Sequence, residues 1–368
     1  MKVLYMTNIP APYRVEFFNE LSKLCDLTVI YERKMASDRE PSWFSNEKGN
    51  YRNIFLNGKC VGTDSSVSIG AIKHLSKNNY DIIIFGVYHT LTAMITMQYL
   101  RWRRIKFILN SDGGFIKKDS AVKYKLKRHF IHMADAYLSS GNNTSDYLEH
   151  YGANKKKIYI YPFTSLHDKD ILEYVVDSEH KKRIKEKLNI REEKVVFSVG
   201  QIIYRKGFDI LIMACKKLPE NVGVYIAGGQ PSEDILRLMK QNDINNLHFI
   251  GFKNREELAE YYQLADLFVL PTREDIWGLV VNEALSYGLP VITTNKCNAG
   301  LELINNGVNG YIVNVNDVEE LSNKMIKLLL SDTILRSMAG NCLVKIREYS
   351  LEKMALNHKT MFDSFLKQ

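Results

Sequence analysis

The chain has 368 residues, of which 45% are hydrophobic and 25% charged, so the disordered and fibrous classes are excluded. At roughly 150 residues per domain, this length predicts two domains, each able to bury a core. The net charge of +8 is uneven, because residues 1–165 carry +10 and residues 166–368 carry −2. This asymmetry indicates an anionic partner, such as nucleic acid or an anionic membrane, for the first half only.

The cysteines and the N-terminus bear on the cellular compartment. The five cysteines form no CxxC pair, which predicts neither a disulfide framework nor a zinc ribbon. They are Cys25, Cys60, Cys215, Cys297 and Cys342. The opening residues, MKVLYMTNIP, have the pattern of a strand and none of the features of a signal peptide. We therefore expect a cytoplasmic protein.

The first half alternates β-branched runs with amphipathic helical runs, a pattern typical of parallel sheets joined by crossover helices. The expected strands are 2–6, 27–31, 81–85, 106–110, 136–140 and 157–161. The expected helices are 15–25, 90–102, 121–133 and 144–151. The uncharged stretch of 19 residues between Asp81 and Arg101 has the length of a membrane-spanning helix. Its β-type start and its Gly86 favour a strand, a loop and a helix instead.

The second half repeats this layout after a boundary at 161–170, where a proline and turn-forming residues follow the last strand. The expected strands are 194–200, 222–228, 247–251, 267–271 and 290–294. The expected helices are 180–190, 209–218, 233–242, 255–264, 279–288, 317–330 and 350–366.

We therefore expect an α/β protein of two doubly wound, Rossmann-like domains that face each other across a cleft. The N-terminal domain spans 1–165 and the C-terminal domain spans 166–349, and the final helix, 350–368, packs back on the N-terminal domain. Doubly wound sheets bind ligands at the carboxyl ends of their strands, so the cleft is the expected ligand site.

The segment 271–294, PTREDIWGLVVNEALSYGLPVITT, carries the strongest chemical pattern. A strand ends, a loop follows, and a helix begins with free backbone N–H groups that suit a diphosphate. These N–H groups belong to Gly278, Leu279 and Val280. Asp275 and Glu283 flank the helix start, and carboxylates suit hydroxyl groups rather than phosphate. A nucleotide sugar supplies both a diphosphate and hydroxyls.

A cationic segment, SVGQIIYRKGFDILI, occupies residues 198–212. A strand ends at Gly200, and Arg205 and Lys206 precede the helix that begins at Gly207. Two cations at the carboxyl edge of a parallel sheet can hold phosphate oxygens. Solvated loop charges are the alternative interpretation, and the acidic cluster at an equivalent sheet edge favours phosphate binding.

These two segments resemble a known family. DIWGLVVNEALSYGLPVI resembles the E-x7-E signature of retaining GT-B glycosyltransferases of family four, and VGQIIYRKGFDILI resembles their donor-phosphate loop. The resemblance covers nearly the whole chain. It departs where Asp275, preceded by Glu274, replaces the usual glutamate, where Gln201 replaces an arginine, and where IPAPYR (9–14) replaces a Gly-Gly turn.

The resemblance implies a nucleotide-sugar donor, with UDP as the expected nucleotide, and transfer with retention of anomeric configuration. It also implies no enzyme nucleophile, no obligatory metal and no other cofactor. Arg205 and Lys206 would neutralise the diphosphate of the donor and the departing charge. Glu283 would bind the ribose, and Asp275 would bind the donor sugar. The remaining donor-binding candidates are Gly200, Glu274, Gly278, Leu279 and Val280.

Three residues at strand ends of the first half are candidates for the acceptor side. Asp112 stands near the position where the family often has a histidine that faces the donor sugar, and it is a candidate catalytic residue. His89 has an equal alternative as a loop or core imidazole. Arg14 could bind an anionic group or pack under the first helix. The only DxD sequence, 168–170, fits turn and helix-start chemistry better than a metal site.

The leading hypothesis is a retaining hexosyltransferase. It would move a hexose or N-acetylhexosamine to a lipid-linked or cell-surface polysaccharide, as in capsule or exopolysaccharide synthesis. A nucleotide-sugar epimerase, a thiol-cofactor glycosyltransferase or another transferase with a small soluble acceptor would leave the basic half unexplained. A nucleic-acid-binding protein is the remote alternative, because no nucleic-acid motif is present.

Residues 101–128 contain ten lysines and arginines against Asp112 and Asp119. Trp102 stands among the arginines, and KYKLKRHFIHM can split a helix into a basic and an apolar face. This pattern predicts peripheral docking on an anionic membrane, on the inner face of the plasma membrane. An ordinary surface helix packed on the sheet is the alternative.

Overall fold

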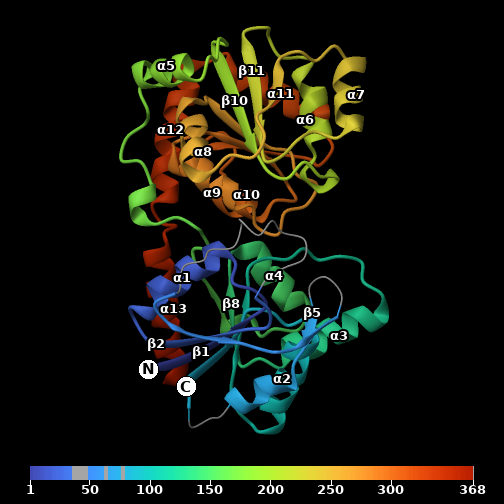
Figure 1. Cartoon of the computed structure of the whole chain (residues 1–368), viewed down its shortest axis with the longest axis vertical. Coiled ribbons are helices and arrows are strands. Elements are labelled where there is room, and N and C mark those ends of the chain that lie inside the picture. Colours follow the sequence, from blue (N-terminus) through green and yellow to red (C-terminus); the bar gives the residue numbers. More distant parts are fainter. Residues whose placement is uncertain (35–48, 62–64, 76–78, 368) are drawn as a thin grey trace. The chain divides into compact units, whose positions relative to one another are not determined.

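The computed structural model describes residues 1–34, 49–61, 65–75 and 79–367 (Figure 1). The chain divides into two compact units. The N-terminal unit contains residues 1–165 and 349–368, and the C-terminal unit contains residues 166–348. Each unit is built around its own sheet.

The N-terminal unit contains a seven-stranded parallel sheet in the order β3-β2-β1-β6-β7-β8-β9. All six strands expected in this half are present. The strands are β1 (Lys2–Thr7), β2 (Asp26–Tyr31), β3 (Arg52–Phe55), β6 (Ile82–Phe85), β7 (Ile108–Ser111), β8 (Ala136–Ser139) and β9 (Ile158–Ile160). The sequence did not predict β3 or a separate antiparallel pair, β4 (Lys59–Val61) and β5 (Ser65–Val67). These strands are short, and those of the pair are only three residues long, so they carry little periodic signal.

The helices of this unit lie between the strands or at the chain end. They are α1 (Pro12–Ser22), α2 (Leu91–Trp102), α3 (Ala121–His132), α4 (Asn142–His150) and α13 (Leu351–Leu366), with 3-10 turns η2 (Ile69–His74) and η3 (Lys155–Lys157). The uncharged stretch after Asp81 forms β6, a loop and α2, as predicted. None of the helices in the described ranges is long and apolar enough to cross a bilayer.

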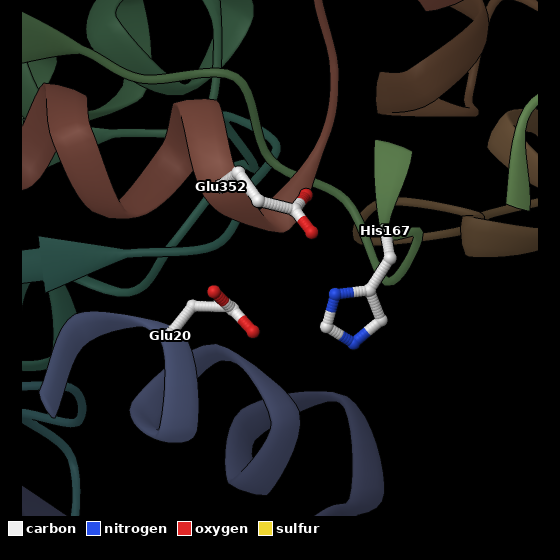
Figure 2. A group of neighbouring side chains, drawn as sticks. All are labelled: Glu20, His167 and Glu352. Carbon is white, nitrogen blue, oxygen red and sulfur yellow. The ribbon is translucent and has the colours of Figure 1, made fainter. Parts of the chain in front are cut away.

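The terminal helix α13 packs against α1. The ring of Phe17 on α1 lies 4.7 Å from that of His358 on α13. Burial lowers the pKa of His358 to about 3, so its imidazole is neutral at physiological pH. The carboxylates of Glu20 and Glu352 on the same two helices come within 4.8 Å of each other (Figure 2). The ammonium group of Lys23 contacts both carboxylate oxygens of Glu20 at 2.7 Å and offsets the repulsion between the two glutamates.

The C-terminal unit contains a six-stranded parallel sheet in the order β12-β11-β10-β13-β14-β15. The strands are β10 (Lys194–Val199), β11 (Val222–Ala227), β12 (Leu247–Phe249), β13 (Leu267–Leu270), β14 (Val291–Thr294) and β15 (Gly310–Val313). The α-helices are α5 (Ser178–Lys187), α6 (Phe208–Cys215), α7 (Glu233–Gln241), α8 (Arg255–Leu264), α9 (Leu279–Ser286), α10 (Asn298–Leu303), α11 (Val318–Leu329) and α12 (Asp332–Ile346). Two 3-10 turns are η4 (Asp168–Asp170) and η5 (Tyr204–Lys206).

The expected fold class of two Rossmann-like parallel sheets is confirmed. In each sheet the strand order reverses beside the first strand, between β1 and β6 and between β10 and β13. Such a reversal is the point at which doubly wound sheets bind ligands. Cys25, Cys215, Cys297 and Cys342 are free thiols, and the side chain of Cys60 lies outside the described residues.

Candidate functional site

Two loops meet at the carboxyl edge of the C-terminal sheet. One follows β10 and contains η5, which carries Arg205 and Lys206; the other follows β13 and contains Asp275. The ammonium nitrogen of Lys206 lies 2.6 Å from Asp275 Oδ2, and Arg205 Nη1 lies 3.6 Å from Oδ1. The two predicted cations and the predicted acid therefore form one cluster, in which the Lys206 and Asp275 side chains are largely buried.

Glycines allow this close approach. Gly207 adopts a left-handed conformation with φ of 71° between η5 and α6. A Cβ atom there would lie 2.1 Å from the carbonyl oxygen of Pro271, so only glycine fits. Gly200, predicted as a donor contact, lies beside the Lys206 side chain, which would be 3.4 Å from a Cβ at that position.

The start of α9 presents unpaired backbone donors. Gly278 is left-handed, with φ of 101°, and directly precedes the helix. Within the described ranges, no hydrogen bond is donated by the N–H groups of Gly278, Leu279 or Val280. These groups, a helix dipole and the nearby cations Lys206 and Arg205 suit an anion.

Glu283 lies on α9 one turn further and is held by a residue that the sequence did not single out. The hydroxyl of Tyr262 donates to Glu283 Oε2 at 2.9 Å, and Tyr262 stacks on Tyr287 with ring centroids 5.2 Å apart. Burial raises the pKa of the Glu283 carboxyl. Among the described residues, no hydrogen bond reaches Glu283 Oε1, so this oxygen can accept from a ligand hydroxyl.

Glu274, the neighbouring acid, places its backbone carbonyl in this cluster. Its carbonyl oxygen accepts hydrogen bonds from Arg205 Nη1 at 2.8 Å and from the Thr272 hydroxyl at 3.1 Å. Asp275, in contrast, directs its carboxylate at the cations. The contacts of Asp275 with both cations are compatible with its predicted role as the first acid of the signature.

A second polar cluster lies at the carboxyl edge of the N-terminal sheet, around Asp112. Its Oδ1 atom accepts hydrogen bonds from Arg14 Nη2, from Asn110 Nδ2 at 2.9 Å and from the Tyr161 hydroxyl at 2.9 Å. Its Oδ2 atom accepts none from the part of the chain that the structure describes. One oxygen of Asp112 is thus fixed, and the other can accept a hydrogen bond from a ligand hydroxyl.

Arg14 is buried behind Asp112, and this limits its role. Only 3% of the residue is exposed, and its guanidinium lies beside the ring of Tyr5. Arg14 can therefore orient Asp112, but its burial keeps the guanidinium from direct contact with an anionic ligand. Sequence alone did not link the two residues, which are separated by 98 positions.

Two predicted features remain, His89 and the DxD sequence at 168–170. His89 is exposed in the loop between β6 and α2, edge-on to Tyr88. In the DxD sequence, Asp170 accepts from the His167 backbone N–H at 2.9 Å and pairs with Arg255 at 2.6 Å. Asp170 therefore stabilises a turn and an ion pair.

Comparisons with known proteins identify what this chain is similar to. Residues 180–342 match the family model described as glycosyl transferases group 1. An uncharacterized glycosyltransferase of Haemophilus influenzae is 29% identical over 46% of this chain and 49% of its own, so the chain spans about half of that relative. The N,N'-diacetylbacillosaminyl-diphospho-undecaprenol alpha-1,3-N-acetylgalactosaminyltransferase of Campylobacter jejuni is 22% identical over 77% of this chain and 71% of its own.

Among solved structures, HepE of Anabaena in complex with UDP superposes with a TM-score of 0.79. It is 15% identical and the match covers 99% of this chain and 100% of that one. At this identity the likeness shows the fold, which is GT-B, as the resemblance implied.

Proposed function

Since the chain belongs to the glycosyl transferases of group 1, we propose that it is a retaining glycosyltransferase. It moves a hexose or N-acetylhexosamine from a UDP-sugar to a lipid-linked or cell-surface polysaccharide, in the cytoplasm. The observation that carries this proposal is the cluster of Lys206, Arg205 and Asp275 beside the unpaired N–H groups of α9. The UDP bound to HepE supports a UDP-sugar as the donor. The diphospho-undecaprenol in the name of the Campylobacter relative supports a lipid-linked acceptor.

Each group in the C-terminal cluster has a role with such a donor. The N–H groups of α9 and the side chains of Lys206 and Arg205 hold the diphosphate. Glu283, oriented by Tyr262, accepts hydrogen bonds from the ribose, and Asp275 accepts them from the sugar. In the N-terminal unit, the open oxygen of Asp112 binds a hydroxyl of the acceptor.

In the proposed reaction, the bond between the anomeric carbon and the diphosphate oxygen breaks, and its electron pair leaves with the diphosphate. The acceptor hydroxyl oxygen bonds to the anomeric carbon, and its proton passes to the departing phosphate oxygen. Lys206 and Arg205 stabilise the charge that develops there. The reaction as proposed uses no metal and no other cofactor.

Incubation with labelled UDP- and GDP-sugars tests this function. We expect slow hydrolysis of one donor, with the released sugar first appearing in the anomeric form of the donor, as followed by NMR. UDP at 100 times its dissociation constant should stabilise the protein by about 2.7 kcal/mol. Absence of both binding and hydrolysis across the donor panel would overturn the proposal, and release of the opposite anomer would overturn retention.

Glu283→Gln is expected to stabilise the ligand-free protein and to weaken UDP binding by about 10-fold, because a carboxylate accepts from hydroxyls more strongly than an amide. Burial raises the pKa of Glu283 in the folded state. Its contribution to stability is therefore complete below the unfolded pKa and is lost as pH rises through the folded pKa. Thermal unfolding at pH 4 to 8 and calorimetry with UDP measure both effects.

Glu257→Gln is the matched control for that pH effect. The backbone of Asn254 and the ammonium of Lys253 hold the pKa of Glu257 below its usual value. This variant should lose stability at neutral pH, with UDP binding unchanged. Destabilisation of the ligand-free protein by Glu283→Gln, or unchanged UDP affinity, would contradict the ribose assignment.

We also propose that the protein docks on an anionic membrane through α2, α3 and the segment between them, here called the basic face. Exposed apolar side chains lie along both helices, among them Trp102 on α2, and Val122 and Leu126 on α3. His129 Nε2 lies 3.2 Å from Gln98 Oε1 and joins the two helices. Exposed cations surround them: Arg101, Arg103, Arg104, Lys106, Lys117, Lys118, Lys123, Lys125 and Arg128.

The acidic residues of this segment do not oppose that charge at the surface. Asp119 is almost fully buried; it pairs with Lys127 at 2.8 Å and with the exposed Lys123 at 3.4 Å, and Tyr151 also donates to it. Lys127 is therefore a structural cation and does not belong to the basic face. An anionic bilayer offers negative charge to the cations and an interface to Trp102 and the aliphatic side chains.

We expect reversible binding to vesicles with anionic lipid, none to neutral vesicles, and release by about 0.5 M salt, where the Debye length is short. Neutralising Arg101, Lys118 and Lys125 to glutamine should weaken binding without changing donor hydrolysis. The matched control is Lys216, Lys217 and Lys240 to glutamine, which removes equal charge from the C-terminal unit. Equal partitioning onto both vesicle types, or onto neither, would overturn the docking proposal.

A further inference from the structure

Arg273 ties together the two loops that carry the cations and the acid of the C-terminal cluster. Its backbone N–H donates to the Arg205 carbonyl at 2.8 Å, and the buried Thr272 hydroxyl donates to the same oxygen at 3.0 Å. The loop after β13 thus bonds directly to the turn that carries Lys206. Neither contact follows from the sequence pattern, because more than 60 residues separate the loops.

The Arg273 side chain makes further hydrogen bonds and an ion pair with the loop after β10 and with α6. Its guanidinium makes a bidentate pair with Asp209 on α6, at 2.8 and 2.6 Å, and donates to the Tyr204 carbonyl at 2.7 Å. It also lies 3.9 Å from the centre of the Tyr204 ring. Only 13% of the Arg273 side chain is exposed. Hydrogen bonding to Asp209 raises the pKa of this arginine, so it stays charged.

These contacts enclose the turn η5 from both ends. Tyr204 is held at the start of the turn, the Arg205 carbonyl in its middle, and Asp209 just beyond Gly207. Lys206 lies between these contacts along the chain, and it can reach Asp275 only while the turn keeps its position. Long cationic side chains on an untied surface loop would sample many rotamers in water.

We propose that Arg273, paired with Asp209, is a positioning residue that presents Lys206 and Arg205 to the donor diphosphate before the donor binds. The inference rests on the proposed function and deepens it, because Arg273 acts through Lys206 and touches no substrate. Arginine is required here: a lysine cannot make the bidentate pair, reach the Tyr204 carbonyl and stack on the ring together. Pre-organisation of this kind lowers the cost of reaching the reactive geometry.

The experiment measures UDP-sugar hydrolysis and UDP affinity in the full chain. Arg273→Gln is expected to lower kcat by about 10-fold or more, with a smaller change in UDP affinity, and Arg273→Lys is expected to fall nearly as far. In the Lys206→Ala background, Arg273→Gln should change kcat less than about 3-fold, because residues that act as a unit are not additive.

Asp209→Asn and Lys194→Gln serve as second variant and control. Asp209 lies on the first turn of α6 and is partly exposed, so asparagine preserves the fold while removing the charge that holds Arg273. We expect an intermediate loss of kcat. Lys194 is the first residue of β10 and pairs with Asp332. Lys194→Gln should leave kcat unchanged.

Amide hydrogen exchange of the ligand-free protein provides a readout independent of activity. The N–H groups of Lys206 and Gly207 bond within the turn, to Ile203 and Tyr204 carbonyls at 2.9 and 3.1 Å. Arg273→Gln should speed their exchange, while the Asp170 N–H in the turn η4 keeps its rate.

The outcomes separate this inference from the proposed function. A wild-type protein that neither binds UDP nor hydrolyses a UDP-sugar would refute the function, and unchanged exchange would still refute the positioning role. If wild type is active, full activity of Arg273→Gln or full additivity with Lys206→Ala would overturn the role of Arg273 alone.

Discussion

Lys206→Ala is expected to lower kcat for donor hydrolysis by about 100-fold or more. Lys206 is largely buried and stands 2.6 Å from Asp275, at the place where the donor diphosphate is proposed to bind. With little water around it, an ammonium group stabilises leaving-group charge more strongly than an exposed lysine would. Steady-state hydrolysis of a UDP-sugar measures the loss.

Lys217→Ala is the matched control for Lys206→Ala. Lys217 pairs with Glu319 on the surface of the same unit, and its removal should leave kcat unchanged. Removing Lys206 also leaves Asp275 without its main partner, so we expect a stability loss of about 1–3 kcal/mol, measured by urea unfolding. A folded Lys206→Ala enzyme with kcat within a few-fold of wild type would show that Lys206 does not serve the leaving group.

Asp275→Asn is expected to lower kcat by about 100-fold, whereas Glu274→Gln should change it less than about 3-fold. The Asp275 carboxylate lies between Lys206 and Arg205, and asparagine keeps its shape but removes its charge. The backbone carbonyl of Glu274 accepts hydrogen bonds from Arg205 and Thr272, and glutamine preserves that carbonyl. Donor hydrolysis by the two variants, compared at equal folded fraction, decides between the two acids.

Asp275→Asn should also cost some stability, since Lys206 would keep only a neutral partner. Thermal unfolding of both variants separates this effect from catalysis. The reverse result, with Glu274→Gln inactive and Asp275→Asn active, would make Glu274 the first acid of the signature and would shift the motif by one residue.

The sequence by itself determined the two-sheet architecture and most of the C-terminal cluster. Strand runs such as 2–6 and 194–200 are apolar and β-branched, and the helices between them have a clear apolar period, so both are local patterns. Arg205, Lys206 and Asp275 could be brought together because each follows a strand, and the carboxyl ends of parallel strands share one edge.

Some elements carried too little local signal. The helix α12 spans 15 residues, yet it contains a glycine and several small polar residues, and it was not expected. Its buried face, which includes Leu335 and Met338, becomes recognisable only through the core against which it packs. The short strands β3 and β15, each four residues long, gain stability from pairing with a neighbour rather than from their own composition.

Only the tertiary structure decided which polar groups are partners. Lys127 pairs with the buried Asp119 and so does not belong to the basic face, and Arg14 lies buried behind Asp112. Arg273 pairs with Asp209, and Tyr262 donates a hydrogen bond to Glu283. The hydrophobic periodicity of a sequence predicts local helices and strands from residues that are near one another along the chain. These partners stand 8 to 98 positions apart in the sequence. A hydrogen bond between them depends on the path of the backbone that separates them, and on atoms placed within about a few tenths of an ångström.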